Sequence, residues 1–526
     1  MTTTANDAAD RIDGGTGDDT IAISAGSSFV FNTDDTAVTN VEFVTVGSAG
    51  SVTLSGQTDG FTVNAGGGNE TVVGSEGADS ISGSLGNDVI TGGAGADTID
   101  GGAGTDTVSY ADVTTATSHN LPLIGASVGI QGMAINLSDT AVTEADVFAA
   151  TTFNPATVGT GDLAAGSAEY LVSAADEDAQ YVVDTLSNVE TVIGSALVDY
   201  IQLGSGGMTA TGGAGADVMI GGSGNDTFNA EMTDALISGG AGTDTAVFTA
   251  GGTLAADMTG VENAIIAGST TAYVFTAQTT ALNISMSDNV AVTVTGGGAA
   301  NTITTGDGAD NVTGAAAAVD TISTGAGNDT IDGLSGNDII NAGAGNDQIS
   351  MTDNDIVTGG AGRDTFIANA GALGTILQTI TDFEAGVADT LDITLSGPPA
   401  VAADITAATV QTDFAAAAQV AINGVLADSY LVGSGGLITF FDEAATFGTT
   451  ELIAQSTADV QAIAAQIALE GFAATASIFK LDEDGDGVAE SSVVYNATGT
   501  ELIKLVGVTA DTGLNITATA GDIHII

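Results

Sequence analysis

The chain has 526 residues, of which 66 are acidic and only 4 are basic, so its formal charge at pH 7 is -62. Hydrophobic residues make up 44% of it, which excludes a disordered acidic tail. Four basic side chains are too few to neutralise the phosphates of a nucleic acid, so nucleic acid is excluded as a partner. No apolar stretch is long enough for a transmembrane segment.

Residues 1–64 are predicted to form an N-terminal β segment that contains one isolated nine-residue unit, "GGTGDDTIA" at Gly14. Residues 65–109 are a first repeat block. In it the pattern recurs without a gap from Gly74 to Ser109, with glycine at the head of each unit and aspartate in sixth position. A fixed short period of this kind predicts the stacked coils of a solenoid rather than a globular domain.

Each unit divides into a turn and a strand. The first six residues are rich in glycine, as a tight turn requires, and the last three, such as "SIS" or "VIT", are β-formers around one apolar residue. Two units therefore make one coil, in the order turn, strand, turn, strand. The middle residues, such as Ile81 and Ile90, are predicted to point inward and to form a thin core, each contributing about 1.5–3 kcal/mol by burial.

The rest of the chain alternates repeat blocks with other segments. In chain order these are an insert (110–193), a second block with several weak units (194–250), a β segment (251–295), a third block (296–368) and a C-terminal β-rich domain (369–526). The stretches between the blocks alternate apolar and polar residues, as in "LNISM", and are predicted to be further strands.

A second internal repeat lies outside the nonapeptides. In "TNVEFVTVGS", "SNVETVIGS" and "TGVENAIIAGS" it places Glu42, Glu190 and Glu262 just before an apolar run. We interpret these glutamates as caps of a recurring strand-entry corner, and a metal-ligand role is the alternative.

Stacking the coils brings the aspartates of successive units into line. At the interstrand spacing of about 4.8 Å, each adjacent pair of carboxylates repels by about 3 kcal/mol, which matches or exceeds the gain from the thin core. No cysteine is present to hold the coils by disulfides. The register of acids therefore predicts a hard divalent cation between coils, and calcium best fits a flexible shell of carboxylate and carbonyl oxygens.

The units have the form GGxGxDxUx and resemble the RTX nonapeptide, a calcium-binding β-helix repeat. The resemblance implies an all-β chain of calcium-bound parallel β-roll (β-solenoid) blocks, exported unfolded by a type I secretion channel and folded outside the cell by multiple calcium ions. Carried over to this sequence, the sixth-position ligands are Asp19, Asp79, Asp88, Asp97, Asp106, Asp217, Asp226, Asp244, Asp310, Asp329, Asp338, Asp347 and Asp364. Glu70 and Asn301 hold that position in two weak units, which argues against calcium there. The alternative is that the aspartates are solvated turn acids.

The C-terminal domain lacks the nine-residue repeat of the blocks. "TITDFEAGVADTLDITL" resembles the segment that follows the repeats in RTX exoproteins, and the apolar ending "AGDIHII" resembles type I secretion signals. One helix is predicted over 456–471, with Ser456 as its N-cap and Gly471 at its end.

One more candidate calcium loop lies in "LDEDGDGVAE". Asp482, Asp484 and Asp486 alternate before a glycine, as in the first half of an EF-hand loop. Val493 stands where the loop would need glutamate, so a full EF-hand is not expected, and an isolated calcium loop and an ordinary turn remain as alternatives.

Catalytic constellations are not found. The only histidines are His119 and His524, and no HExxH motif is present, so a zinc protease is excluded. The GxSxG match "GASVG" around Ser127 is expected by chance among 75 glycines, and only His524 follows it. A pore-forming toxin would need acylated lysines and a long apolar helical region before the repeats. We therefore expect no enzyme.

Two functions remain. Repeat blocks alternating with such β segments resemble bacterial surface-layer proteins, which implies a secreted, calcium-dependent structural protein that assembles with itself into an S-layer or filament at the cell surface. Its expected partners are further copies of itself, lipopolysaccharide or another surface glycan as anchor, and the type I secretion machinery. The alternative is a calcium-dependent adhesin or matrix-binding protein with ligand contacts in residues 110–181.

Overall fold

The computed structural model describes residues 12–31, 38–113, 130–142, 163–172, 183–268, 272–286, 290–368 and 377–383 and, from residue 390 onward, strands alone. The chain forms two compact units, Met1–Ile266 and Ala267–Ile526. The described part of the chain contains strands and no helix, so the all-β prediction is confirmed. Among these residues no helix could cross a membrane.

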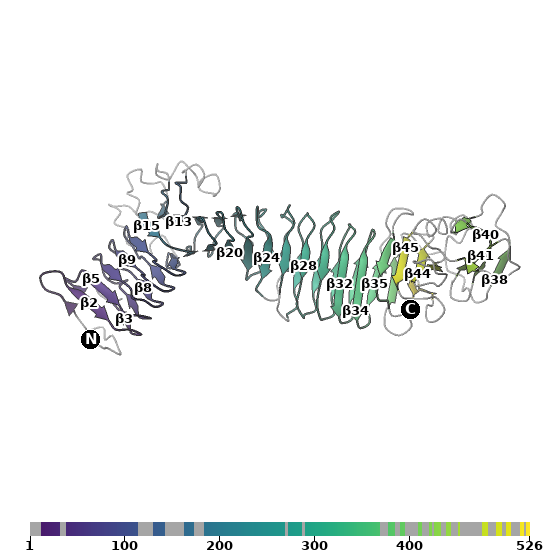
Figure 1. Ribbon diagram of the computed structural model, residues 1–526, viewed down its shortest axis with the longest axis horizontal. Helices are drawn as coiled ribbons and strands as arrows, with labels where there is room; N and C mark the ends of the chain where they lie inside the picture. The colour runs from purple at the N-terminus through teal and green to yellow at the C-terminus, as the bar shows by residue number, and fades with distance from the viewer. Residues whose placement is uncertain are drawn as a thin grey trace. The chain divides into compact units, whose positions relative to one another are not determined.

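Unit 1 is a parallel β-solenoid whose coils stack as rungs (Figure 1). We name its two sheets 1A and 1B. Sheet 1A consists, in spatial order, of β2 (Thr20–Ile23), β5 (Phe43–Val46), β7 (Thr62–Asn64), β9 (Ser80–Ser82), β11 (Thr98–Asp100), β15 (Val183–Ser187), β14 (Ser167–Val172), β13 (Ile130–Asn136), β17 (Tyr200–Gln202), β19 (Val218–Ile220) and β21 (Leu236–Ser238). Sheet 1B consists of β3 (Ser28–Val30), β6 (Ser51–Thr53), β8 (Thr71–Val73), β10 (Val89–Thr91), β12 (Thr107–Ser109), β16 (Thr191–Ile193), β18 (Thr209–Thr211), β20 (Thr227–Ala230), β22 (Thr245–Phe248) and β24 (Asn263–Ile266). Two short strands, β1 (Ile12–Asp13) and β4 (Val38–Thr39), pair with each other, and β23 (Gly252–Thr253) is a further short strand.

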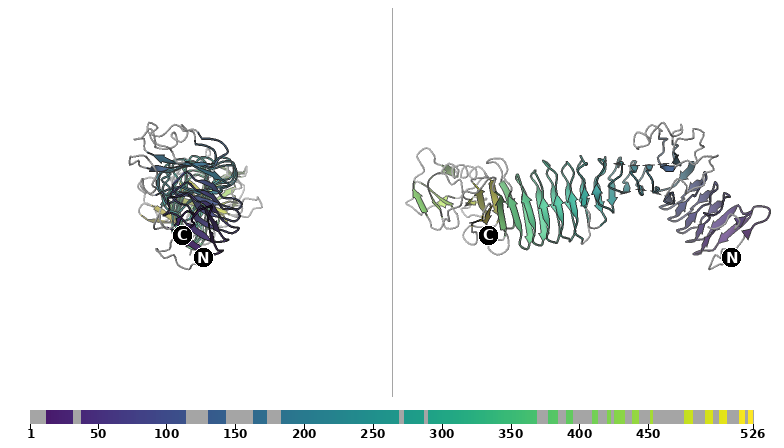
Figure 2. Two further views of the ribbon diagram at one scale, coloured as in Figure 1. Left: turned by 90° about the vertical axis from the view of Figure 1, so that its left-hand side faces the viewer. Right: turned by 180° about the vertical axis from the view of Figure 1, so that it is seen from behind.

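Unit 2 repeats this plan, and its rungs are seen again from behind in Figure 2. Sheet 2A consists of β25 (Ala272–Val274), β27 (Thr293–Thr295), β29 (Asn311–Thr313), β31 (Thr330–Asp332), β33 (Gln348–Met351), β35 (Thr365–Ala368), β37 (Thr390–Thr394), β47 (Asp522–Ile525) and β46 (Ile516–Thr519). Sheet 2B consists of β26 (Asn283–Ser285), β28 (Thr302–Thr304), β30 (Thr321–Ser323), β32 (Ile339–Ala344), β34 (Ile356–Ala361), β36 (Leu377–Ile380), β45 (Glu501–Val506), β44 (Ser491–Asn496) and β43 (Ala476–Leu481). A small antiparallel sheet holds β38 (Thr409–Thr412), β39 (Val420–Ile422), β40 (Val425–Val432), β41 (Ile438–Asp442) and β42 (Glu451–Leu452).

The core of the roll is one apolar side chain deep. Ile81 pairs with Ile99 in sheet 1A and Ile90 with Val108 in sheet 1B, and all four are at most 2% exposed. Because successive side chains of a strand point to opposite faces, Val89, next to Ile90, is 42% exposed. The two-unit coil and the inward-pointing middle residues predicted from the repeat are therefore confirmed.

The insert extends one sheet only. Its strands β13 and β14 pair antiparallel and enter sheet 1A between β15 and β17, whereas sheet 1B passes from β16 directly to β18. A bridge between Val142 and Leu163 lies in the same insert. Leu163 packs in one cluster with Tyr200 and Val218, which are 2% and 0% exposed, and Val142 packs against it. The insert therefore covers part of sheet 1A.

Of the remaining sequence predictions, one falls on described residues and the others do not. The strands expected between blocks two and three are present as β25, β26 and β27, so that prediction is confirmed. The helix predicted over 456–471, the acidic loop with Asp482, Asp484 and Asp486, and the residues His119 and Ser127 all lie outside the described residues.

Candidate calcium-binding turns

The sixth-position aspartates end the turns and immediately precede the strands. All except the half-buried Asp19 are 0–3% exposed. For these residues the interpretation as solvated turn acids is therefore wrong. A buried carboxylate needs hydrogen bonds or a cation to offset the loss of its water shell.

In the buried sixth-position aspartates, one carboxylate oxygen accepts a hydrogen bond from the neighbouring coil. The backbone N–H of Asp79 donates to Oδ1 of Asp97 at 2.9 Å, and that of Asp88 donates to Oδ1 of Asp106 at 2.8 Å. In unit 2 the N–H of Asp329 donates to Oδ1 of Asp347 at 2.8 Å. These bonds join aspartates one coil apart into ladders along each edge of the roll, which we call the aspartate ladders.

The other oxygen is unpaired in most turns. In the described part of the chain, Oδ2 is buried without a hydrogen-bond partner in Asp19, Asp88, Asp97, Asp106, Asp217, Asp244, Asp310, Asp329, Asp338 and Asp347. In the turns that begin with glycine, this first residue closes the space around Oδ2. A Cβ on Gly83, for example, would come within 2.5 Å of Oδ2 of Asp88, so only glycine allows this approach.

Asn301 shows what these oxygens lack. It stands at the aspartate position of a weak unit, and its Nδ2 lies beside the head glycine of its turn, Gly296, as Oδ2 does in the other turns. From there Nδ2 donates to the carbonyl oxygens of Ala299 and Gly297, at 2.7 and 3.4 Å. In an aspartate the atom at this place is Oδ2, a hydrogen-bond acceptor, which would face carbonyl oxygens that are also acceptors. A cation bound by carboxylate and carbonyl oxygens would resolve that conflict, so the turns fit calcium.

Most turns adopt one of two conformations, and the turn that ends at Asp310 belongs to neither. In open turns the second residue has a positive φ, 102° at Gly93 before Asp97, and Oδ2 of the aspartate stays unpaired. The open turns are those that end at Asp19, Asp88, Asp97, Asp106, Asp217, Asp244, Asp329, Asp338 and Asp347. In closed turns the second residue donates its N–H to Oδ2, as Ser75 does to Asp79 at 2.7 Å. The closed turns end at Asp79, Asp199, Asp226 and Asp320.

Burial raises the pKa of the ladder carboxyls. The pKa of Asp97 rises to about 8, because the charged form loses its hydration and because Asp184 and Asp79 lie near it. The pKa of Asp199 rises to about 7, again from burial first and then from the charge of Asp217. Burial likewise raises the pKa of Asp88 to about 6. Without a cation, these groups therefore compete for protons near neutral pH.

The ladders include acids that the sequence prediction missed. Each accepts the N–H of a residue one coil away through Oδ1: Asp184, Asp199, Asp234, Asp320 and Asp355. Asp199 is sixth in the weak unit "GSALVDYIQ", so the repeat register could have found it. Asp184 lies 87 residues beyond its partner Asp97, across the insert, and no spacing signals it.

The glutamates of the second internal repeat end the ladders. Oε2 of Glu42, Glu190 and Glu262 accepts the backbone N–H of Asp19, Asp106 and Asp244, at 2.9, 2.8 and 2.8 Å. Each glutamate thus takes the place of the next aspartate where the nonapeptide stops. The interpretation of these residues as corner caps is confirmed.

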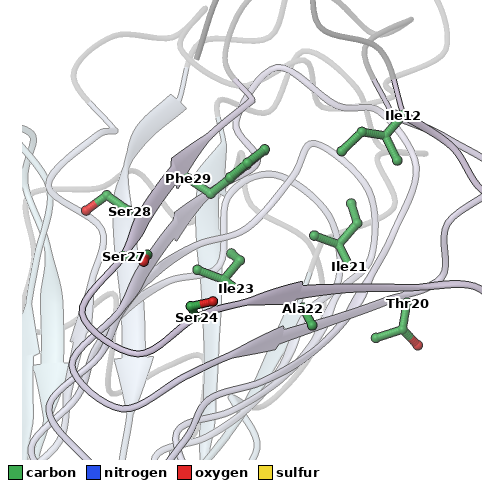
Figure 3. Close-up of a pocket in the computed structure, with 9 residues that line it drawn as sticks. All are labelled: Ile12, Thr20, Ile21, Ala22, Ile23, Ser24, Ser27, Ser28 and Phe29. Carbon is green, nitrogen blue, oxygen red and sulfur yellow. The ribbon is translucent and has the colours of Figure 1, made fainter. Parts of the chain in front are cut away.

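Other site types are not found in the described part. No group of three or more Asp, Glu, His or Cys side chains is placed to hold a metal, so the turns would rely on main-chain carbonyls for most ligands. A hollow at the N-terminal end of unit 1 is lined by aliphatic and hydroxyl side chains, among them Ile12, Ile23 and Phe29 (Figure 3). Its lining contains no acid, base or metal ligand.

Stacked, buried carboxylates with unpaired oxygens on a parallel β-roll define a class, the calcium-stabilised β-rolls. The family model for the RTX calcium-binding nonapeptide repeat matches residues 4–27, 64–95, 73–108, 203–234, 211–246, 293–318, 316–349 and 351–372. The chain's repeats therefore belong to the RTX family, and they bind multiple calcium ions. No curated protein matches the chain.

The two turn conformations predict different effects of Asp→Asn substitutions. In Asp97→Asn the new Nδ2 can donate to the turn carbonyls as Asn301 does, so the roll stays folded but calcium binding at that turn weakens by about tenfold or more. In Asp79→Asn, a closed turn, calcium binding should stay within about twofold of wild type. Calorimetric titration with calcium measures both. Equal losses in the two variants would contradict the distinction between turns.

The raised pKa values predict how pH acts on the calcium-free protein. The folded state holds protons that the unfolded chain has lost above about pH 4, so the free energy of unfolding falls as pH rises through the window to about pH 8. Thermal melts of dialysed protein between pH 5 and pH 8 check this. Calcium affinity should rise over the same window, because protons stop competing. A calcium-free stability that is flat or rises with pH would contradict the assignment.

Proposed function

We propose that the chain is a calcium-dependent structural protein that assembles with itself at the bacterial cell surface, as an S-layer or a filament. Proteins with RTX repeats are typically secreted. The observation that carries the proposal is that aspartate ladders recur through both units, from the capped Asp19 to Asp364. Turns that fit calcium therefore recur along the described roll.

Calcium would act at two levels. Inside a coil it offsets the buried carboxylates, and a chain without disulfides stays unfolded until the ion is available, as export through a type I channel requires. Between copies, a charge of -62 produces repulsion over a Debye length of about 8 Å at physiological salt. Bound calcium lowers that charge and permits contact. The proposal gives the chain no catalytic role.

A calcium-dependent adhesin is the second candidate, favoured by one feature of the insert. A hollow of about 330 Å³ lies within the insert, and its lining includes Ser138 and Asp139, which follow β13, and Ser187 and Asn188 at the end of β15. Hydroxyl, amide and carboxylate groups of this kind suit a polar ligand such as a glycan.

The two levels predict two calcium dependences. Circular dichroism should show folding at a calcium concentration that is independent of protein concentration. Light scattering should show assembly at higher calcium, with a midpoint that falls as protein concentration rises. Magnesium should support neither, because it keeps its water shell and demands tight octahedral geometry. Folded protein that stays monomeric by sedimentation across millimolar calcium would refute assembly and leave the adhesin function.

A further inference from the structure

The outer faces of sheets 1B and 2B are free of charge. On each three-residue strand the first and third side chains point outward, and in the described roll none of these on sheet 1B, or on sheet 2B from β26 to β36, is acidic or basic. In sheet 1B most are threonine or serine, including Thr71, Thr107, Thr209 and Thr227. The first charged side chain on this face of sheet 2B is Lys504 of β45, which pairs with Thr379.

Uncharged outer faces are unusual in a chain with 66 acidic residues. The described acids lie mainly in the turns. The opposite sheets are not equivalent: Asp100 ends β11 of sheet 1A and Asp332 ends β31 of sheet 2A. Part of sheet 1A is also covered by the insert, which buries Tyr200 and Val218. Sheets 1B and 2B therefore present the uncharged faces that the described insert leaves open.

Apolar side chains are exposed on the same faces. Four of the seven large hydrophobic residues that are exposed in the described part lie there: Val89 (42%), Ile265 (39%), Ile339 (48%) and Ile356 (46%). Ile339 and Ile356 are direct neighbours, because β32 and β34 pair them in register. Exposed aliphatic side chains that lie side by side, as Ile339 and Ile356 do, mark a contact surface.

We propose that these uncharged faces, which we call the B faces, are the surfaces through which one copy of the chain docks on a second copy. The inference rests on the proposed function and names its contact. Two strongly acidic chains can approach without burying carboxylates only where they carry none. Serine and threonine hydroxyls both donate and accept hydrogen bonds, so such a face can pair with an identical face across a two-fold axis.

The size of the face fits a lattice contact. Ten strands about 4.8 Å apart, each about 10 Å long, give sheet 1B an area of about 500 Å² per partner, or about 1,000 Å² buried in total. That is the lower limit for a specific interface, so one contact is weak and many together are stable. Assembly by the B faces should therefore depend steeply on protein concentration.

The third block offers a matched pair of variants. Ile339→Asp/Ile356→Asp places two acids side by side on the B face of sheet 2B. The control, Thr330→Asp/Gln348→Asp, places two acids side by side on the outer face of sheet 2A. All four positions follow a ladder aspartate and point outward, so both variants add the same charge at the same place in the repeat.

The experiment compares calcium-induced folding by circular dichroism and assembly by sedimentation for the full-length wild type and both variants. Both should fold like wild type, because no inward side chain changes. The B-face variant should need about tenfold more protein, or more, to assemble, and the control less than about twofold more. Equal shifts, or a larger shift in the control, overturn the B-face contact while the proposed function stands. A wild type that folds but stays monomeric overturns the proposed function itself. Wild-type monomers that instead bind a glycan array support the adhesin.

Discussion

The burial of one carboxylate oxygen per open turn, without a hydrogen-bond donor, is the constraint on which this molecule depends. Oδ1 is bound by the coil before it, whereas Oδ2 faces the head of its own turn, as in Asp97. A protein can keep such an atom only if a proton or a cation supplies the missing partner. The raised pKa values describe the first solution, and calcium is the second.

The rest of the roll cannot override that constraint. Each coil buries only a few aliphatic side chains, such as Ile90 and Val108, and there is no cysteine. The closed turns moderate the demand, because Ser75 or its equivalents supply the missing donor from the backbone. Closed turns are therefore held by protein hydrogen bonds, whereas open turns would need an ion. The same arrangement gathers the described acids at the turns and leaves the B faces uncharged.

Much of this could be predicted from the sequence, because the repeat carries it. The sixth-position aspartates, the inward middle residues and the parallel coils follow from a period of nine residues, and the corner role of Glu190 follows from a second repeat. What could not be predicted depends on contacts without a fixed spacing. Asp184 joins a ladder only because the insert folds back, and the difference between Asp79 and Asp97 depends on the φ of one turn residue. The sequence repeat shows which residues align in the stacked coils, but it does not show which carboxylate oxygens have a hydrogen-bond donor.

The role of ions at the open turns is tested most directly by the far-UV circular dichroism of calcium-free protein, dialysed at pH 8 and low salt, before and after calcium is added. With no ion and few protons available, the stacked carboxylates should outweigh the thin core. We expect an unordered spectrum without calcium and a β spectrum once it is added. A β spectrum that is the same before and after calcium would contradict the claim that ions at the open turns hold the roll together.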